Sequence, residues 1–244
     1  MRYLVLSDIH SNLQALEAVL ADAAAVGYDE VLVLGDLVGY GGDPMAVIDR
    51  TLALKPVAIV RGNHDKVCAG LESAESFNDV ARLAAEWTAS VLDAAHLQTL
   101  AQLPQGPVRV TPEIEICHGA PFDEDFYVLD EQDAEQALAR ANARLCLFGH
   151  THIVTLFATV ADTFGEQTDR LGEYYLPAKG PALINVGSVG QPRDRDSRAA
   201  YGILDTEKGT IWLRRTVYNI RAAQERILEV GLPVRLALRL DQGI

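Results

Sequence analysis

The chain has 244 residues, of which 49% are hydrophobic and 23% are charged, and its formal net charge is −13. This composition is typical of a globular protein, and we expect residues 1–244 to form a single domain. The negative charge argues against non-specific binding to nucleic acids, because their phosphates would be repelled.

The cysteines and the apolar stretches point to a cellular location. Three scattered cysteines without a CxxC pair argue against a disulfide framework, and two of them, Cys117 and Cys146, lie in apolar runs and are expected to be buried. No apolar stretch approaches the ~18 residues needed to cross a bilayer. The run Tyr3–Leu6 is too short for a signal peptide. We therefore expect a cytoplasmic protein without membrane contact, whose oligomeric state the sequence does not indicate.

The first 65 residues repeat one pattern, in which a short apolar run leads into a polar turn and then into a helical pattern. Ser11 and Gln14 are predicted to form a capping box for the first helix, and Asp43 with Pro44 begins the second. The alternation predicts parallel βαβ units, whose ligands bind beyond the carboxyl ends of the strands. The three apolar runs are predicted to be strands: Tyr3–Leu6, Val31–Leu34 and Val57–Val60.

The rest of the chain continues to mix both element types. Residues 76–103 have a helical pattern, and we expect a helical layer or lid at about residues 66–103. Residues 161–180 suggest an exposed loop or hairpin, and residues 232–240 a packed terminal segment. Helices are predicted at Glu131–Asn142 and Asn219–Val230, and strands at Val108–Val110, Ile114–Cys117, Leu145–Phe148, Ile153–Ala158, Ala182–Val186, Tyr201–Leu204 and Thr210–Val217.

Five of the six histidines follow an apolar strand within a few residues; only His96 lies in a helical stretch. In an extended turn alternate residues point the same way, so Asp8-x-His10 is predicted to direct two ligands to one metal ion. The pair His150-x-His152 is predicted to do the same with two imidazoles.

Asp36 ends the second strand and has two carboxylate oxygens, so it can bridge two cations. Asn63 offers a carbonyl oxygen and His118 a further imidazole, which makes seven candidate ligands in all. Seven are too many for one ion and suit two ions that share Asp36. Because the set mixes nitrogen and oxygen without thiolate, it indicates two divalent transition-metal ions, with Mn favoured over Fe, Ni, Co or Zn.

Two such ions can hold a bridging hydroxide at neutral pH, which points to hydrolysis of a phosphoester. His64 directly follows Asn63, so it is not expected to bind the same ion. We predict that His64 protonates the leaving group as a general acid. Asp65 and Asp43 are the two candidates for orienting its ring.

In their order along residues 3–155, the motifs Asp8-x-His10, Gly35-Asp36, Gly62-Asn63-His64-Asp65, His118 and Gly149-His150-Thr151-His152 resemble those of the calcineurin-like metallophosphoesterase superfamily. The stretch 185–193 is similar to a loop of its small bacterial and archaeal phosphodiesterase branch. The resemblance implies an α/β fold, a four-layer α/β/β/α sandwich of two mixed sheets, and gives His64 the leaving-group role. It also implies two metal sites: Asp8, His10, Asp36 and His152 in the first, and Asp36, Asn63, His118 and His150 in the second.

Two departures from motifs of other branches narrow the choice among the branches of this superfamily. The turn after Asp36 lacks the second Asp and the Arg of the Ser/Thr protein phosphatases. Gly39 stands where purple acid phosphatases have a Tyr ligand, and Tyr40 comes one residue late. A small-branch phosphodiesterase or phosphatase remains, and it would act on a small phosphoester.

Several interpretations stay open. Arg61 contacts phosphate or pairs with a carboxylate, and the turn 187–190 supports the metal site or is only structural. Asn63 and Arg193 are candidates for substrate binding, Arg193 because a guanidinium group binds phosphate in a forked geometry. The alternative function is a catalytically silent scaffold for protein interaction, which the complete ligand set disfavours.

Overall fold

Two six-stranded β-sheets pack face to face in the computed structural model, which describes residues 1–160, 163–168 and 171–244. In spatial order the first sheet contains β3 (Ala58–Ile59), β2 (Glu30–Val33), β1 (Arg2–Leu6), β11 (Ala199–Asp205), β12 (Thr210–Thr216) and β9 (Gly172–Tyr175). The second contains β4 (Val108–Thr111), β5 (Ile114–Ile116), β6 (Leu145–Phe148), β10 (Ala182–Val186), β7 (Val154–Val160) and β8 (Thr163–Thr168). Both sheets are mixed: β1, β2 and β3 run parallel, as predicted, and so do β5, β6 and β10.

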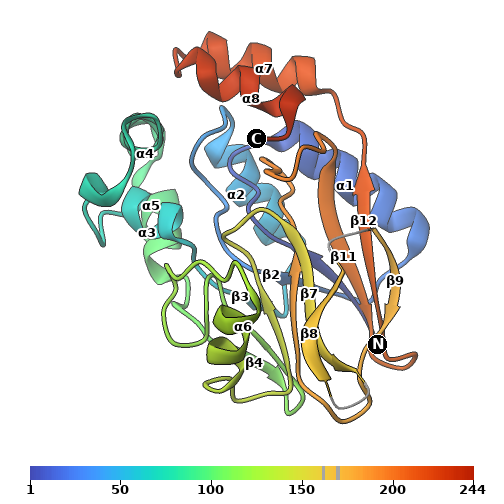
Figure 1. Cartoon of the computed structure of the whole chain (residues 1–244). Coiled ribbons are helices and arrows are strands. Elements are labelled where there is room, and N and C mark those ends of the chain that lie inside the picture. The colour runs from blue at the N-terminus through green and yellow to red at the C-terminus, as the bar shows by residue number, and fades with distance from the viewer. Residues whose placement is uncertain (161–162, 169–170) are drawn as a thin grey trace.

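Helices cover both outer faces of this pair of sheets (Figure 1). The core between the sheets is apolar and includes Val5 and Leu147. The order helix, sheet, sheet, helix confirms the four-layer sandwich. The α-helices are α1 (Leu13–Val26), α2 (Pro44–Ala53), α3 (Asn63–Cys68), α4 (Asp79–Val91), α5 (Ala94–Gln102), α6 (Glu131–Leu138), α7 (Ile220–Glu229) and α8 (Val234–Gln242).

Apolar side chains attach the helices to the sheets. Leu16 and Val19 of α1 pack with Leu4 of β1 on the outer face of the first sheet. On the outer face of the second sheet, α6 packs in a cluster that contains Cys117 and Cys146, which are buried as predicted. Among the described residues, no helix is both long enough and apolar enough to span a membrane.

The beginning of α1 differs from the prediction. The capping box of Ser11 and Gln14 is wrong, because the N-cap is Asn12, whose side-chain oxygen accepts a hydrogen bond from the backbone N–H of Ala15 at 3.0 Å. Ser11 has a φ of 52°, and Gln14 donates a hydrogen bond to Asp43 instead. The first polar turn is therefore one residue longer than the helical pattern suggested.

For two later segments, the structure is more specific than the prediction from the sequence. Part of the stretch 161–180 forms strands: β8 makes a hairpin with β7, whereas β9 pairs with β12 at the edge of the first sheet. Residues 161, 162, 169 and 170 of that prediction lie outside the described residues. The terminal segment is helix α8, which is packed as predicted and contacts α7.

The core between the two sheets gives a test of this architecture. Leu147 is fully buried on β6, so truncation in Leu147→Ala should leave a cavity and lower the free energy of unfolding by about 2–5 kcal/mol. Leu83→Ala is the matched control, because Leu83 is 50% exposed on α4 and its loss should cost less than about 0.5 kcal/mol. Urea titration followed by tryptophan fluorescence would measure both; equal effects would contradict the assigned core.

Candidate metal centre

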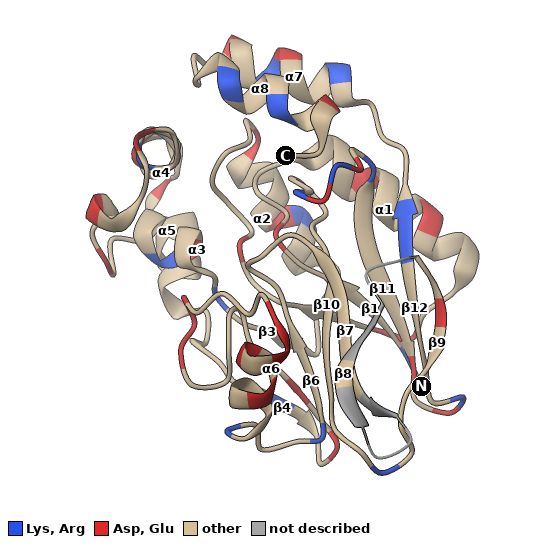
Figure 2. Ribbon diagram, in the orientation of Figure 1, with Lys and Arg blue, Asp and Glu red and all other residues tan. Residues whose placement is uncertain are grey.

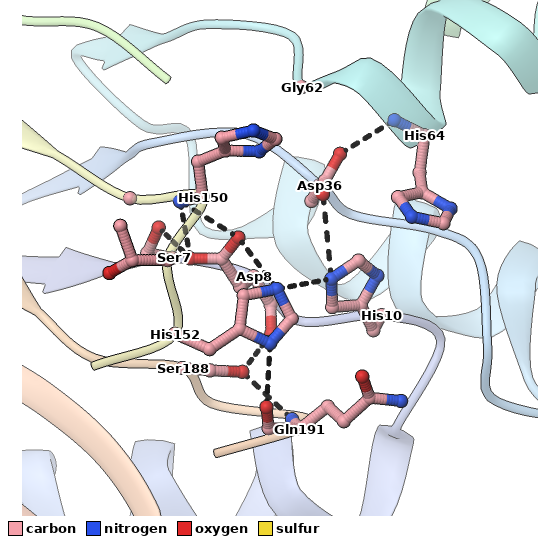
Figure 3. A network of polar contacts seen from close by, with 12 residues as sticks. Ser7, Asp8, His10, Asp36, Gly62, His64, His150, His152, Ser188 and Gln191 are labelled. Carbon is pink, nitrogen blue, oxygen red and sulfur yellow. Dashed lines mark hydrogen bonds and ion pairs between the residues drawn. The ribbon is translucent and has the colours of Figure 1, made fainter. Parts of the chain in front are cut away.

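Polar side chains from turns after five strands lie close together. Figure 3 shows five of them: Asp8, His10, Asp36, His150 and His152. Two residues follow β1, one follows β2, one opens α3 after β3, one follows β5 and two follow β6. These are the seven residues predicted as ligands, and all but Asn63 are buried: Asp8, His10, Asp36, Asn63, His118, His150 and His152. Because the ends of these strands lie close together, residues that are far apart in the sequence meet at the site.

The backbone of these turns is strained. Non-glycine residues seldom adopt a positive φ, and such conformations persist only where the surroundings hold them, often at functional sites. The extended backbone predicted for Asp8-x-His10 and for His150-x-His152 is therefore wrong, although all four side chains reach the site. Five candidate ligands have a positive φ: Asp8 (52°), His10 (49°), Asp36 (52°), His150 (67°) and His152 (61°).

The candidate ligands form two groups that share Asp36. In each group the ligand atoms lie within 4.8 Å of one another and could hold a metal ion. Oδ1 of Asn63 lies 3.2 Å from Nε2 of His118 and so joins the second group. The first group is Asp8, His10, Asp36 and His152, and the second contains Asp36, His118 and His150.

Each of the four imidazoles is oriented by a main-chain carbonyl group. The ring nitrogen that points away from the site makes this hydrogen bond, which leaves the lone pair of the other nitrogen facing the site. The four contacts are His10 Nδ1 to Val38 O (2.9 Å), His118 Nδ1 to Leu34 O (2.8 Å), His152 Nδ1 to Gln191 O (2.6 Å) and His150 Nε2 to Asp125 O (3.1 Å).

As a result, acceptor atoms face one another across the site. Nε2 of His10 lies 3.1 Å from Nε2 of His152, and two lone pairs at this separation repel. Burial lowers the pKa of both imidazoles well below the usual value, so at neutral pH neither carries a second proton that could bridge them. A cation placed between them would bind both lone pairs and remove the repulsion.

The second group has the same geometry with a different electrostatic balance. Nε2 of His118 lies 3.1 Å from Nδ1 of His150. Burial acts to lower the pKa of His118, but the nearby Asp36 carboxylate outweighs it and raises that pKa to about 10. Burial lowers the pKa of His150 to about 3. Without a metal ion, a proton on His118 would therefore occupy the position that a cation can take.

Asp36 lies between the two groups. Its Oδ1 accepts a hydrogen bond from the backbone N–H of His64 at 2.9 Å. Its Oδ2 is buried, has no hydrogen-bond partner among the described residues, and lies 3.4 Å from Nε2 of both His10 and His118. Burial would raise the pKa of Asp36, but neighbouring imidazoles, above all His118, hold it well below the usual value. Oδ2 of Asp36 is ionised, accepts no hydrogen bond from the described residues and is equally close to both groups, as expected of a ligand that two metal ions share.

The turn that follows β10 supports the first group. The Ser188 hydroxyl donates a hydrogen bond to the carbonyl oxygen of Asp8 at 2.8 Å, and Gly190 N–H donates to the same oxygen at 3.0 Å. The carbonyl oxygen of Gln191 orients His152, as described above. Of the two interpretations of residues 187–190, support of the site is the one these contacts favour.

His64 lies beside the two groups without joining either. Its ring packs against those of Tyr40, Phe77 and His10, with centroids 4.4, 4.6 and 4.9 Å away. Its Nδ1 is buried and has no hydrogen-bond partner among the described residues, and burial lowers the pKa of the ring to about 4. Packing against aromatic rings therefore sets the orientation of His64.

Neither of the carboxylates predicted to orient His64 does so. Asp65 accepts hydrogen bonds from the backbone N–H groups of Val38 (3.1 Å) and Gly62 (2.9 Å). Asp43 accepts from Arg226 at 2.8 Å. Both predictions are wrong because each carboxylate is already engaged in holding the chain.

Gly39 is explained by the same packing. A Cβ atom at this position would lie 2.5 Å from Nδ1 of His64, and Gly39 has a φ of 88°. A tyrosine ligand at position 39 is thus incompatible with the observed place of His64. Tyr40 instead packs its ring on His10 at 4.7 Å.

A small pocket of about 120 Å³ opens above the two groups, and Arg193 lies in its wall. Nη2 of Arg193 lies 3.2 Å from Oε1 of Gln191 and 3.4 Å from the hydroxyl of Tyr40. Arg61, by contrast, pairs with Glu124 through two hydrogen bonds of 3.0 and 2.8 Å. The carboxylate interpretation of Arg61 is therefore confirmed, whereas Arg193 is placed where a phosphate could reach it.

Sequence reasoning missed the aromatic wall of this pocket. Phe77, Tyr127 and Tyr40 line it, and the ring of Tyr127 lies 3.9 Å from that of His150. Phe77 and Tyr127 occur in stretches without a recognisable motif, so no signal in the sequence could have found them. The sequence singles out Tyr40 only through its spacing from Asp36 along the chain.

The chain as a whole is similar to known proteins. A family model described as "Calcineurin-like phosphoesterase superfamily domain" matches residues 1–209. A protein of Methanocaldococcus jannaschii, "Uncharacterized protein MJ0912", is 34% identical over 244 residues, which is 98% of this chain and 97% of that protein.

Two solved structures are similar over the whole chain. A metallophosphoesterase from Sphaerobacter thermophilus is 35% identical, with full coverage of both chains and a TM-score of 0.88. A hypothetical protein, PH1004, from Pyrococcus horikoshii OT3 has the same fold at 20% identity, with a TM-score of 0.80 and coverage of 100% of this chain and 98% of that one. The chain therefore belongs to the calcineurin-like phosphoesterase superfamily, in agreement with the motifs at the ends of its strands.

Proposed function

We propose that the protein is a metal-dependent hydrolase that cleaves a small phosphomonoester or phosphodiester with two divalent transition-metal ions. The observation that carries the proposal is the convergence of metal-binding atoms. Two pairs of imidazole nitrogens lie 3.1 Å apart, and Oδ2 of Asp36, which has no hydrogen-bond partner among the described residues, lies 3.4 Å from one nitrogen of each pair. Membership of the superfamily supports the hydrolytic class. The cytoplasmic location stays a prediction.

The donor set fits two ions that share one carboxylate. Nitrogen and oxygen donors without thiolate suit Mn, Fe, Ni, Co or Zn, of which we favour Mn. When bound, two such ions supply a hydroxide nucleophile at neutral pH and neutralise the charge of the phosphate group. The first ion would be held by Asp8, His10, Asp36 and His152, and the second by Asp36, Asn63, His118 and His150.

Three side chains in the pocket would act on the substrate itself. Arg193 and Asn63 would bind oxygens of the phosphate group, Arg193 through charge-assisted hydrogen bonds. His64 would donate a proton to the leaving oxygen. The low pKa of His64 does not prevent this, because the negative charge of a bound phosphoester favours the protonated ring.

Activity is the first test. The protein loaded with Mn²⁺ should hydrolyse p-nitrophenyl phosphate, bis-p-nitrophenyl phosphate or both, and Asp36→Asn should lower kcat by orders of magnitude, because the shared ligand loses its charge. Release of p-nitrophenolate measures the rate. If metal-loaded protein released none from either ester, the catalytically silent scaffold would become the better interpretation.

The number of bound ions is a separate test. Elemental analysis of protein prepared without chelators should find close to two ions per chain, and close to one after His150→Ala, since that change affects only the second group. The control is His96→Ala, because His96 lies on α5 and pairs with Asp49 and Asp93. Equal metal content in His150→Ala and wild-type protein would contradict the assignment of His150.

The role of His64 can be separated from metal binding. His64→Ala should keep the full metal content but lose kcat by roughly 10²–10⁴-fold on an alkyl phosphoester, whose leaving group needs a proton. The loss should be much smaller for p-nitrophenyl esters, whose leaving group departs as a stable anion. A loss of the same size on both ester types would mean that His64 has a structural role.

A further inference from the structure

A second cavity adjoins the pocket at the candidate metal centre. The two share Tyr40 and Asn78 in their walls, and the second has a volume of about 740 Å³. Arg235 and Arg239 of α8 line this cavity. The pocket at the metal centre and the cavity beside the C-terminal helix therefore adjoin, and arginine lines each of them.

The ring of Tyr40 lies between the two arginine-bearing spaces. The guanidinium carbon of Arg193 is 5.8 Å from its centroid, and that of Arg239 is 5.9 Å away. Nε of Arg193 is buried and has no hydrogen-bond partner among the described residues. Nε of Arg239 donates to the main-chain oxygen of Ile244. The two guanidinium groups therefore lie near the same aromatic ring, one in the wall of each cavity.

These cations lack a side-chain ion-pair partner in the described part of the chain. No carboxylate side chain lies within 4.0 Å of Arg193, Arg235 or Arg239 there, whereas the arginines of α7 are paired, Arg226 with Asp43 and Arg221 with Glu225. The contact of Arg239 with the terminal residue Ile244 is a main-chain one, and Asp79 also lines the second cavity. In a chain with a net charge of −13, a group of three arginines without side-chain carboxylate partners is suited to an anionic ligand.

Helix α8 is held firmly in this position. Leu236 and Leu240 pack with Tyr40 and with residues of α4 and α7 in one apolar cluster. Gln224 of α7 also donates a hydrogen bond to the carbonyl oxygen of Ala237 at 3.0 Å. Figure 2 shows Lys and Arg segments on α7 and α8, beyond residue 209, where the family match ends. The two arginines are therefore an addition to the part of the chain that the family model describes.

We propose that Arg235 and Arg239 form a second anion-binding site, and that the natural substrate is a small phosphoester carrying a second phosphate group. This inference rests on the proposed function, because the phosphate to be cleaved must lie at the metal centre beside Arg193. The other phosphate would then lie in the second cavity, where guanidinium groups bind phosphate through charge-assisted hydrogen bonds. An ester without a second anionic group would leave the second cavity without a phosphate for Arg235 and Arg239 to bind.

A pair of chromogenic esters tests the inference. Thymidine 5′-(p-nitrophenyl phosphate) and the same compound with an additional 3′-phosphate have the same bond to be cleaved. With metal-loaded wild-type protein, the 3′-phosphate should lower KM roughly tenfold or more, as expected for hydrogen bonds to a charged group. In the double variant Arg235→Gln, Arg239→Gln the KM values of the two esters should become nearly equal.

Arg221→Gln is the matched control, because Arg221 lies on α7, is exposed and pairs with Glu225. It should keep the KM ratio of the wild-type protein. A ratio that is close to one in the wild-type protein, or that survives in the double variant, would overturn the second anion site while leaving the proposed hydrolysis intact.

A binding measurement separates this inference from the proposed function. Calorimetry on metal-loaded protein should show tighter binding of thymidine 3′,5′-bisphosphate than of thymidine 5′-monophosphate, with the difference lost in the double variant. If neither ester is hydrolysed but this difference is found, the proposed function fails and the anion site stands. Equal affinity for both nucleotides would reject the anion site, whether or not the esters are cleaved.

Discussion

The burial of many metal-binding side chains in one small volume is the constraint on which the rest of this structure depends. Four imidazoles and two carboxylates are buried together, and each imidazole is held by a main-chain carbonyl in the orientation that turns its other ring nitrogen toward its neighbours. Backbone strain adds to the cost, since positive φ at non-glycine residues costs of order 1–3 kcal/mol each. A fold keeps such an arrangement only where packing over-determines it, and the turn after β10 together with the two apolar cores provides that packing. Bound cations would convert the repulsion between His10 and His152 into attraction and would take the place of the proton on His118.

The elements closest to this constraint were predictable from the sequence. Short apolar runs that end in Asp, Asn or His predict buried strands with ligands at their carboxyl ends, because parallel strands present these ends at one edge of a sheet. The division of ligands into two groups was not predictable from the residues. The alternation of residues predicts that His150 and His152 bind one ion. Their left-handed backbone instead directs the two side chains to different groups. Only the resemblance to a superfamily implied this division. Local pattern does not reveal a positive φ at aspartate or histidine.

The surroundings of His64 show a second limit of sequence reasoning. A neighbouring carboxylate was the natural candidate to orient the ring, and Asp65 is adjacent in the chain. Asp65 is instead taken up by two backbone N–H groups, one of them from the turn after β2, and so stabilises the loop that carries Asp36. The ring is positioned by Tyr40 and Phe77, and Phe77 lies in the short segment before α4, which has no motif. Contacts between distant elements decide such questions, and they leave no local signature.

The candidate metal ligands and the walls of the adjoining cavities come largely from different elements of the fold. The candidate ligands all follow the ends of strands, within the residues that match the superfamily. The pocket walls come from other elements: the segment before α4, the loop that contains Tyr127, and helix α8. Because strand ends are fixed by the sheets while these outer elements can vary without disturbing the ligands, one metal centre can serve many phosphoesters. In the proposed function, the metal centre would therefore carry the bond cleavage that is typical of the superfamily, and the charge and shape of the outer elements would select the substrate.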